Sequence, residues 1–256
     1  MKLKTTLLSA FAAFLSVAGV ANASDWSTVR VGTEGAYPPF NYIDAAGELK
    51  GFDVEIAQAL CAELKVECTY TTQDWDGIIP ALLANKFDII IGSMSITEER
   101  KKKVDFTDKY YATPARFVAR KDTTITSTSP EALAGMTLGA QSSTTHGGYL
   151  EDNYTDSNIR LYATLDEANA DLATGRLDAV MADSVVLWDW TVNTEEGSCC
   201  DLVGESYSEL WSTGVGMAVR KTDPELTQMF NKALAAILAN GTYKAINDKY
   251  FPFSVY

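Results

Sequence analysis

The chain has 256 residues, which is enough for one large or two medium-sized domains with a substantial buried core. Its formal net charge of −13 argues against a nucleic-acid-binding protein, which needs a basic surface. The charge says little about a small ligand, because the charge of a pocket and the net charge of a protein need not agree.

The first 23 residues have the pattern of a secretory signal peptide. Lys2 and Lys4 give a positive start, an apolar core covers residues 7–20, and an A-x-A cleavage pattern ends at Ala23. The apolar core is too short to span a bilayer comfortably, which disfavours a membrane anchor. We therefore expect a periplasmic protein, exported through a signal peptide that is cleaved near Ala23.

Strand-like runs then alternate with helical patterns. The predicted elements are a strand over Val29–Thr33, a helix over Val54–Leu64, a strand over Glu67–Thr72, a helix over Ile78–Ala84 and a strand over Phe87–Ile91. Asp53 stands directly before the first helix, where it is expected to act as its N-cap. Alternation of this kind is typical of βαβ units and a mostly parallel sheet.

Export to an oxidising compartment favours pairing of the four cysteines. Cys61 and Cys68 lie at the end of one predicted helix and the start of the next strand, and a local disulfide between them is expected. Cys199 and Cys200 are adjacent in sequence. A vicinal disulfide is strained and rare, so free or intermolecular thiols stay open as alternatives.

The stretch IIIGSMSITEER, over Ile89–Arg100, combines the end of a buried strand with hydroxyl side chains and an arginine. Ser95 and Glu98 have the spacing of a capping box, which predicts a helix that starts right after the strand. A helix N-terminus, hydroxyl groups and the forked cation of Arg100 can together hold a carboxylate. The alternative is an ordinary turn with a solvated arginine.

The same alternation restarts after residue 130. The predicted elements are a strand over Met136–Ala140, a polar loop over Gln141–Thr145, a helix over Leu165–Thr174 and a strand over Asp178–Ala182. The segments Ala81–Ser93 and Asp171–Asp183 align weakly, and each ends a buried strand on a polar residue. This suggests two lobes of like construction, with polar groups at strand C-termini, where open α/β sheets bind ligands.

After Gly204 the chain is expected to return to the first lobe. A strand is predicted over Ser212–Met217, and Asp223 with Pro224 starts an amphipathic helix that Gly241 ends. This helix carries no chemical motif and is expected to be core.

Seven segments carry a family resemblance. They read GTEGAYPPF, GFDVEIAQALC, DWDGIIPALLANKFD, SMSITEER, FTDKYY, LATGRLDAVMAD and GTYKAINDKYF, in this order along the mature chain. In their order and spacing the chain resembles the periplasmic amino-acid-binding proteins of the family that includes the lysine/arginine/ornithine- and histidine-binding proteins. These are the solute-binding proteins, family 3, of ABC importers.

The resemblance implies an α/β protein with the two-lobed type II periplasmic-binding-protein fold, in which each lobe is a mostly parallel sheet flanked by helices. Residues 24–111 plus 211–256 would form lobe 1, and residues 112–210 would form lobe 2. That second range includes two hinge crossings, near Ala112–Phe117 and Ser206–Leu210. The Cys61–Cys68 disulfide is also what the resemblance implies.

A free amino acid carries a carboxylate and an ammonium, and each needs a partner once it is buried. The resemblance implies that Arg100 binds the carboxylate, helped by backbone N–H groups of Ser95, Ser143 and Thr144. From the residues alone, Ser143 and Thr144 could equally be a plain helix cap. The resemblance further implies that Asp183 binds the α-ammonium, whereas the simpler interpretation is a solvated loop aspartate.

Gly92 and Ser93 would add a backbone carbonyl and a hydroxyl group. Relatives often carry serine where Gly92 stands, so one hydroxyl is missing here and some room is gained. Tyr37 and Trp75 match aromatic positions that sandwich the ligand side chain, and Glu34 matches an acidic position that favours a cationic or amide tip. The alternatives are core packing for the two aromatic residues and a solvent-facing Glu34.

The resulting hypothesis is a non-catalytic, monomeric carrier that closes on an L-amino acid, preferably arginine, lysine or ornithine, and delivers it to an inner-membrane ABC permease. No cofactor or metal is expected, and His146, the single histidine, is interpreted as a surface or cap residue. An opine or another polar amino acid is an alternative ligand. The alternative from another class is an enzyme similar to cyclohexadienyl dehydratases, in which Glu34 would act as acid or base.

Overall fold

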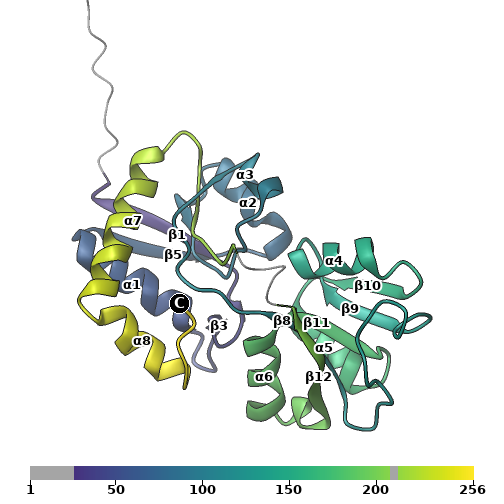
Figure 1. The fold of residues 1–256 in the computed structure, drawn as a ribbon. Helices are drawn as coiled ribbons and strands as arrows, with labels where there is room; N and C mark the ends of the chain where they lie inside the picture. The colour runs from purple at the N-terminus through teal and green to yellow at the C-terminus, as the bar shows by residue number, and fades with distance from the viewer. Residues whose placement is uncertain (1–25, 208–212) are drawn as a thin grey trace, which may run out of the picture.

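The structure is a computed structural model that describes residues 26–207 and 213–256. The predicted signal peptide, residues 1–23, lies outside these described residues. The described chain forms two α/β lobes that lie side by side, each built on its own five-stranded sheet (Figure 1). The two-lobed α/β fold class predicted from the sequence is confirmed.

The sheet of the first lobe combines parallel and antiparallel neighbours. Its strand order is β5 (Glu67–Thr72), β1 (Thr28–Thr33), β6 (Ile89–Ile90), β13 (Ala218–Val219) and β7 (Asp105–Phe106). β5, β1 and β6 are parallel, whereas β13 is antiparallel to both of its neighbours. A small antiparallel sheet of β2 (Ala36–Tyr37), β3 (Asn41–Ile43) and β4 (Leu49–Lys50) follows β1 in the chain.

The sheet of the second lobe repeats this plan. Its order is β10 (Asn158–Tyr162), β9 (Thr137–Gln141), β11 (Ala179–Asp183), β8 (Ala115–Arg120) and β12 (Cys200–Tyr207). The first three are parallel, and β8 is antiparallel to both β11 and β12. In both lobes the third parallel strand therefore meets an antiparallel one, which agrees with the two similarly built halves expected from the sequence.

Three helices, α1 (Phe52–Leu64), α7 (Pro224–Ala239) and α8 (Thr242–Tyr250), cover one side of the first lobe (Figure 1). Their apolar faces join one core, as the helical spacing of Ile56, Leu60 and Phe230 predicts. The expected N-cap of α1 is wrong. Gly51 occupies the cap position, and the Asp53 side chain instead accepts hydrogen bonds in the interior of the lobe.

The other helices are α2 (Trp75–Leu83) and α3 (Glu98–Lys101) in the first lobe, and α4 (Thr145–Asn153), α5 (Leu165–Ala173), α6 (Ser184–Asn193) and the 3₁₀ turn η1 (Glu196–Cys199) in the second. The predicted capping box at Ser95 is wrong. Thr97 caps α3 and accepts a hydrogen bond from the backbone N–H of Arg100, because the chain stays extended for two residues beyond Ser95. Ser95 forms an isolated bridge with Val215 instead.

The strand predicted over Ser212–Met217 is displaced. Regular pairing begins only at Ala218, while Val215 forms isolated bridges with Ser95 and Tyr111. Gly214, just before it, has a left-handed φ of 74°, which interrupts an extended strand. Ser212 itself lies outside the described residues.

The chain passes from one sheet to the other twice, between β7 and β8 and again between β12 and β13. The second passage includes residues 208–212, outside the described part, so the predicted boundaries at residues 111/112 and 210/211 stay predictions. The C-terminal residues return to the first lobe, where the backbone N–H of Ala112 donates to the carbonyl of Val255.

Both cysteine pairs are joined. Cys61 in α1 is bonded to Cys68 in β5, as expected from the sequence. The structure also pairs Cys199 with Cys200, one of the alternatives that the sequence left open. Cys200 is fully buried at the start of β12, in the second lobe.

A buried ionic cluster fastens the first lobe around Asp88. Its carboxylate accepts from the Nε and Nη2 atoms of Arg30 at 2.9 and 2.6 Å, and from Nη2 of Arg220 at 2.9 Å. Arg220 is 8% exposed and also donates to the carbonyl of Phe87. Burial alone would raise the pKa of Asp88, but the hydrogen bonds from the two arginines bring it below its ordinary value.

We expect Asp88→Ala to lower the free energy of unfolding by about 1.5–3 kcal/mol, because it removes the charge-assisted hydrogen bonds from Arg30 and Arg220, although Asp223 still pairs with Arg220. Equilibrium unfolding in urea measures this change. The matched control is Asp105→Ala, whose carboxylate forms an exposed ion pair with Lys221 and should contribute about 0–1 kcal/mol. Equal losses in the two variants would contradict this assignment.

Candidate functional site

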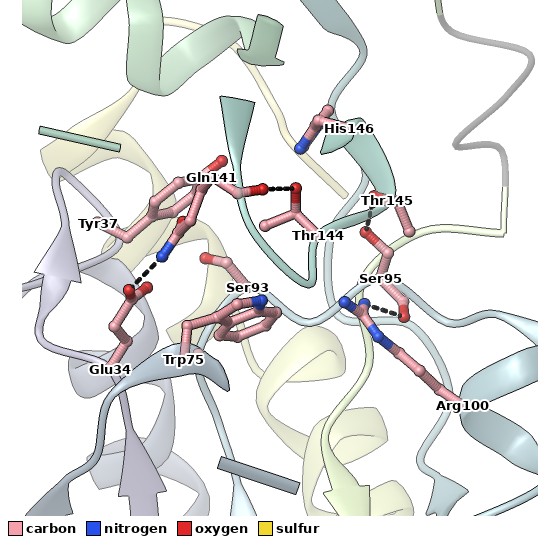
Figure 2. A pocket seen from close by; sticks show the side chains of 11 residues that line it. Glu34, Tyr37, Trp75, Ser93, Ser95, Arg100, Gln141, Thr144, Thr145 and His146 are labelled. Carbon is pink, nitrogen blue, oxygen red and sulfur yellow. Dashed lines mark hydrogen bonds between the residues drawn. The ribbon is translucent and has the colours of Figure 1, made fainter. Parts of the chain in front are cut away.

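The site lies between the lobes, where the carboxyl ends of parallel strands from both sheets supply the lining. Two adjoining cavities share Tyr37, Ser93, Ser95 and His146, and Figure 2 shows the first of them. The first is completed by Glu34, Trp75, Gly92, Arg100, Gln141, Thr144 and Thr145. The second is completed by Thr113, Asp183, Gly214 and Val215. This is the edge at which open α/β sheets bind ligands.

Arg100 is held in place across the cleft. Its Nη1 donates to the carbonyl of Ser95 at 2.9 Å, and its Nη2 donates to the carbonyl of Ser143, in the other lobe, at 3.1 Å. The guanidinium lies over the Trp75 ring, 5.3 Å from the centroid. Burial lowers the pKa of Arg100 to about 10, so it remains a cation at neutral pH. These contacts fix an oriented fork suited to a carboxylate.

Ser143 and Thr144 are the residues of the second lobe that lie beside the Arg100 guanidinium. Ser143 has a left-handed φ of 55°, and its carbonyl also accepts from Nε1 of Trp75 at 3.2 Å. Thr144 is the N-cap of α4, and its hydroxyl oxygen accepts from the N–H of Gly147 at 3.0 Å. The plain helix cap considered for this segment is therefore present, at a helix end that lines the cavity.

Asp183 ends β11 on the second lobe and is 7% exposed. Its carboxylate accepts from the N–H of Val185 at 2.8 Å and from the hydroxyl group of Thr113. Burial raises the pKa of Asp183 to about 6, although these donors oppose the shift. Its carboxylate lines a closed cavity, so the solvated loop aspartate does not describe it.

Ser93 and Gly92 follow β6 in the first lobe. Ser93 has a left-handed φ of 56°, and its hydroxyl oxygen lies 2.9 Å from Oδ2 of Asp53. A Cβ atom added to Gly92 would lie 3.0 Å from the hydroxyl oxygen of Thr33. The room gained by glycine at position 92 is therefore small.

Glu34 reaches the other lobe. Its Oε1 accepts from Nε2 of Gln141 at 2.5 Å (Figure 2). Burial raises the pKa of Glu34 to about 7, the Gln141 bond opposes this rise, and the charges of Asp166 and Asp74 add to it. Glu34 is therefore a half-buried carboxyl group that lines the pocket, and the solvent-facing alternative does not apply.

Tyr37 and Trp75 are both 8% exposed and line the first cavity with Glu34. Burial and then the charge of Asp183 raise the pKa of Tyr37 well above its ordinary value, so this phenol stays neutral. Trp75 also belongs to a core cluster of the first lobe. Trp75 therefore packs in the core and also lines the pocket, so both interpretations of this residue apply.

Sequence reasoning missed six lining residues: Thr113, Gln141, Thr145, His146, Gly214 and Val215. Gln141 ends β9, so its position at a parallel-strand C-terminus was the available signal. His146 was interpreted as a surface or cap residue, and this is wrong: it lies in the first turn of α4 and lines both cavities. Burial, and then the charge of Arg100, lower the pKa of His146 to about 3, so it is neutral.

Two negative findings concern the described residues alone. Within residues 26–207 and 213–256, His, Cys, Asp and Glu side chains form no group of three or more that could hold a metal ion. No helix in this same part of the chain is long and apolar enough to cross a membrane.

Comparisons with known proteins agree with this geometry. The family model described as bacterial extracellular solute-binding proteins, family 3, matches residues 29–253. An L-arginine-binding protein of Pseudomonas aeruginosa is 45% identical over 257 residues, covering 99% of this chain and 98% of that protein. The lysine/arginine/ornithine-binding periplasmic protein of Escherichia coli is 37% identical, with 94% of each chain covered.

Among solved structures, an ancestral arginine-binding protein bound to arginine superposes with a TM-score of 0.82. It is 37% identical, and the match covers 88% of this chain and 98% of that one. These relatives are named as binding proteins and not as enzymes, which favours a binding protein over a dehydratase-like enzyme.

The cross-lobe contacts generate a prediction about closure. Gln141→Ala removes a hydrogen bond to a charged group, worth about 1.5–3 kcal/mol, so the ratio of open to closed unliganded protein should rise roughly tenfold or more. Small-angle X-ray scattering should show a larger radius of gyration. The matched control is Gln228→Ala, an exposed position on α7. An unchanged radius in Gln141→Ala would contradict the inference that the Glu34–Gln141 bond holds the lobes closed.

Proposed function

Because this chain belongs to the bacterial extracellular solute-binding proteins, family 3, we propose that it captures a cationic L-amino acid, arginine first, with lysine and ornithine as weaker ligands. The observation that carries the proposal is a set of charged side chains, one buried and two half-buried, without ion pairs. Arg100, Asp183 and Glu34 all line the cleft, and in the described part of the chain none of them forms an ion pair. A ligand with one anionic and two cationic groups complements all three.

The carboxylate end of the ligand is assigned to Arg100. An arginine guanidinium has five N–H donors, and in Arg100 two of them bond to the carbonyls of Ser95 and Ser143. The other N–H donors can bond to a ligand carboxylate. The N-terminal N–H groups at Ser143 and Thr144 add partial positive charge from the second lobe. The backbone N–H of Ser95, from the first lobe, is the third N–H group predicted to bind the ligand carboxylate. Lys103 nearby could not supply the same bidentate geometry.

The α-ammonium is assigned to Asp183, with the Ser93 hydroxyl and the Gly92 carbonyl beside it. Asp183 faces the second cavity, which Ser93 also lines. Burial raises the pKa of Asp183 more than its hydrogen-bond donors lower it, which supports a site for a further positive group. An ammonium group would supply that charge.

The ligand side chain is assigned to Glu34, Tyr37 and Trp75. An aromatic face attracts a cation, and guanidinium stacks well on it. Glu34 offers a carboxylate at the end of this aromatic slot, and Gln141 stands beside it from the other lobe. These features support arginine ahead of lysine, whose ammonium does not stack, and leave an opine as the alternative ligand of the same class.

Family membership also supports the cellular role proposed from the sequence. The chain would act in the periplasm as a monomer after its signal peptide is removed, and it would deliver the bound amino acid to an inner-membrane ABC permease. Contacts from the ligand to both lobes favour the closed state, and release accompanies reopening of the hinge.

Isothermal titration calorimetry with arginine, lysine, ornithine, histidine, glutamine and octopine tests the proposal. Arginine should bind most tightly, because it alone pairs the three charges and stacks in the slot. If no cationic amino acid produces heat while octopine or glutamine does, the assignment of the side-chain end is wrong.

Two substitutions separate the ends of the ligand. Arg100→Ala should weaken every amino acid by about 2–5 kcal/mol, which is thirtyfold or more, because all of them carry the same carboxylate. Glu34→Gln keeps the shape of the slot and should mainly remove the preference for arginine over glutamine. The same titrations measure both effects. Equal weakening of all ligands by both substitutions would contradict this division of roles.

The raised pKa values predict a pH dependence. Glu34 and Asp183 must be ionised to bind a cation, and their pKa values in the empty site are about 7 and about 6. Affinity should therefore be full at pH 8 and fall as the pH drops to 5, by up to about tenfold per pH unit for each group. Binding at pH 7 should release protons, which titrations in buffers of different ionisation enthalpy detect. In Glu34→Gln the part of the fall near pH 7 should disappear.

A further inference from the structure

The carboxylate of Asp53 does not line the ligand cavities, but it holds the hydroxyl of Ser93, which does. Asp53 lies in the first turn of α1 and is 0% exposed. It accepts hydrogen bonds from the hydroxyl of Tyr110 at 2.6 Å, from Nδ2 of Asn41 at 2.9 Å and from the hydroxyl of Ser93 at 2.9 Å. Of these partners, only Ser93 lines the ligand cavities.

The direction of these bonds follows from chemistry. The carbonyl oxygen of Asn41 accepts from the N–H of Gly35, so its NH₂ group must face Asp53. An ionised carboxylate has no proton to give, and Tyr110 and Ser93 must then donate their hydroxyl protons to it. The N-terminal end of α1 adds further stabilisation of the negative charge.

Asp53 has no cation of its own. Across residues 26–207 and 213–256 no lysine or arginine forms an ion pair with it. Burial raises the pKa of Asp53, and the bonds from Tyr110, Asn41 and Ser93 act against that rise. Its charge contributes to the raised pKa of Asp183, across the cleft. The same field favours a cation between the two carboxylates.

The consequence for Ser93 is a fixed polarity. A serine hydroxyl has one proton and two lone pairs, and its proton is committed to Asp53. The side that Ser93 turns to the cavity can therefore only accept a hydrogen bond. An ammonium N–H satisfies such a group, whereas a carboxylate oxygen would meet lone pairs and be repelled.

The backbone at this point agrees with a functional constraint. Ser93 has a left-handed φ, a conformation that is unfavourable for a residue with a side chain and that persists only where its surroundings enforce it. The bond to Asp53 anchors Ser93 in this conformation. Replacing the acceptor would release the hydroxyl and its orientation together.

We infer that Asp53 is a positioning residue that fixes the Ser93 hydroxyl as an acceptor and thereby selects the α-ammonium of the ligand. The inference rests on the proposed function, which it deepens by assigning the selection of one end of the amino acid. It also gives the site a direction, because a ligand bound the other way round would place its carboxylate against an acceptor.

The test compares two ligands that differ only in the ammonium group. Arginine and 5-guanidinovalerate, which is arginine without its α-amino group, are titrated into the wild-type protein and into Asp53→Asn. The amide of the variant has nearly the same shape but offers N–H groups, so Ser93 loses its fixed polarity. We expect arginine to bind at least tenfold more weakly to the variant, while 5-guanidinovalerate changes less than twofold.

Two further variants keep the result interpretable. Ser93→Ala retains Asp53 and should give the same selective loss, so it replaces Asp53→Asn if that protein does not fold. Tyr110→Phe removes another donor to the same carboxylate, together with the long 3.4 Å bond from the Ser93 backbone N–H, but leaves the Ser93 hydroxyl bond, and it should keep the ratio of the two affinities at its wild-type value.

An equal fall for both ligands, or no fall for either, in Asp53→Asn and Ser93→Ala would overturn the inference and leave these residues a purely structural role. Failure of the proposed function is visible separately, in the wild-type protein. If the wild type prefers another amino acid, the ligand pair is built from that amino acid and its analogue without the amino group. If it binds no amino acid, both proposals are wrong.

Discussion

Charge burial between the lobes is the constraint on which the site depends. A buried charge is costly unless it is paired, yet Arg100, Asp183 and Glu34 are held by neutral groups: carbonyl oxygens around the guanidinium, and hydroxyl, amide and backbone N–H donors around the carboxylates. The displaced pKa values of all three record that incomplete compensation. The fold thus holds separated charges of both signs at fixed positions, and their natural complement is a zwitterion that carries one more cation.

The fold achieves this by using the same construction twice. In each lobe a left-handed serine lies at the cleft, Ser93 after β6 and Ser143 after β9, with φ values of 56° and 55°. Such backbones cost free energy and persist because neighbours hold them. Ser93 is anchored by Asp53, and the carbonyl of Ser143 is anchored by Arg100 and Trp75. Each lobe therefore stores a local strain that its own or its partner's side chains stabilise.

The sequence predicted what depends on local pattern. The periodicity of β1, α1, β5 and β11 and the position of Asp183 at a strand end were readable because alternation and capping act over a few residues. Residues whose role depends on the opposite lobe were not readable in this way. Gln141 donates to Glu34, which lies more than a hundred positions away in the sequence, and His146 lines a cavity formed by residues of both lobes. Asp53 is the clearest case in which the local pattern misled. Its position beside a helix start predicts an N-cap, whereas its carboxylate accepts hydrogen bonds from residues that are distant in the sequence.

The hydrogen bonds between the two lobes also bear on selectivity. Glu34 already receives an amide N–H from Gln141, and the carbonyl of Ser143 already receives donors from the first lobe. A ligand therefore gains only the difference between its own contacts and those it replaces. A neutral amide tip offers Glu34 the same kind of donor that Gln141 supplies, so its gain is small. A guanidinium adds its own positive charge to the hydrogen bond with Glu34, and this gives a Coulomb attraction that a neutral amide donor does not supply. Under the proposed function, discrimination between arginine and glutamine would therefore depend on the competing Gln141 bond as well as on the Glu34 carboxylate.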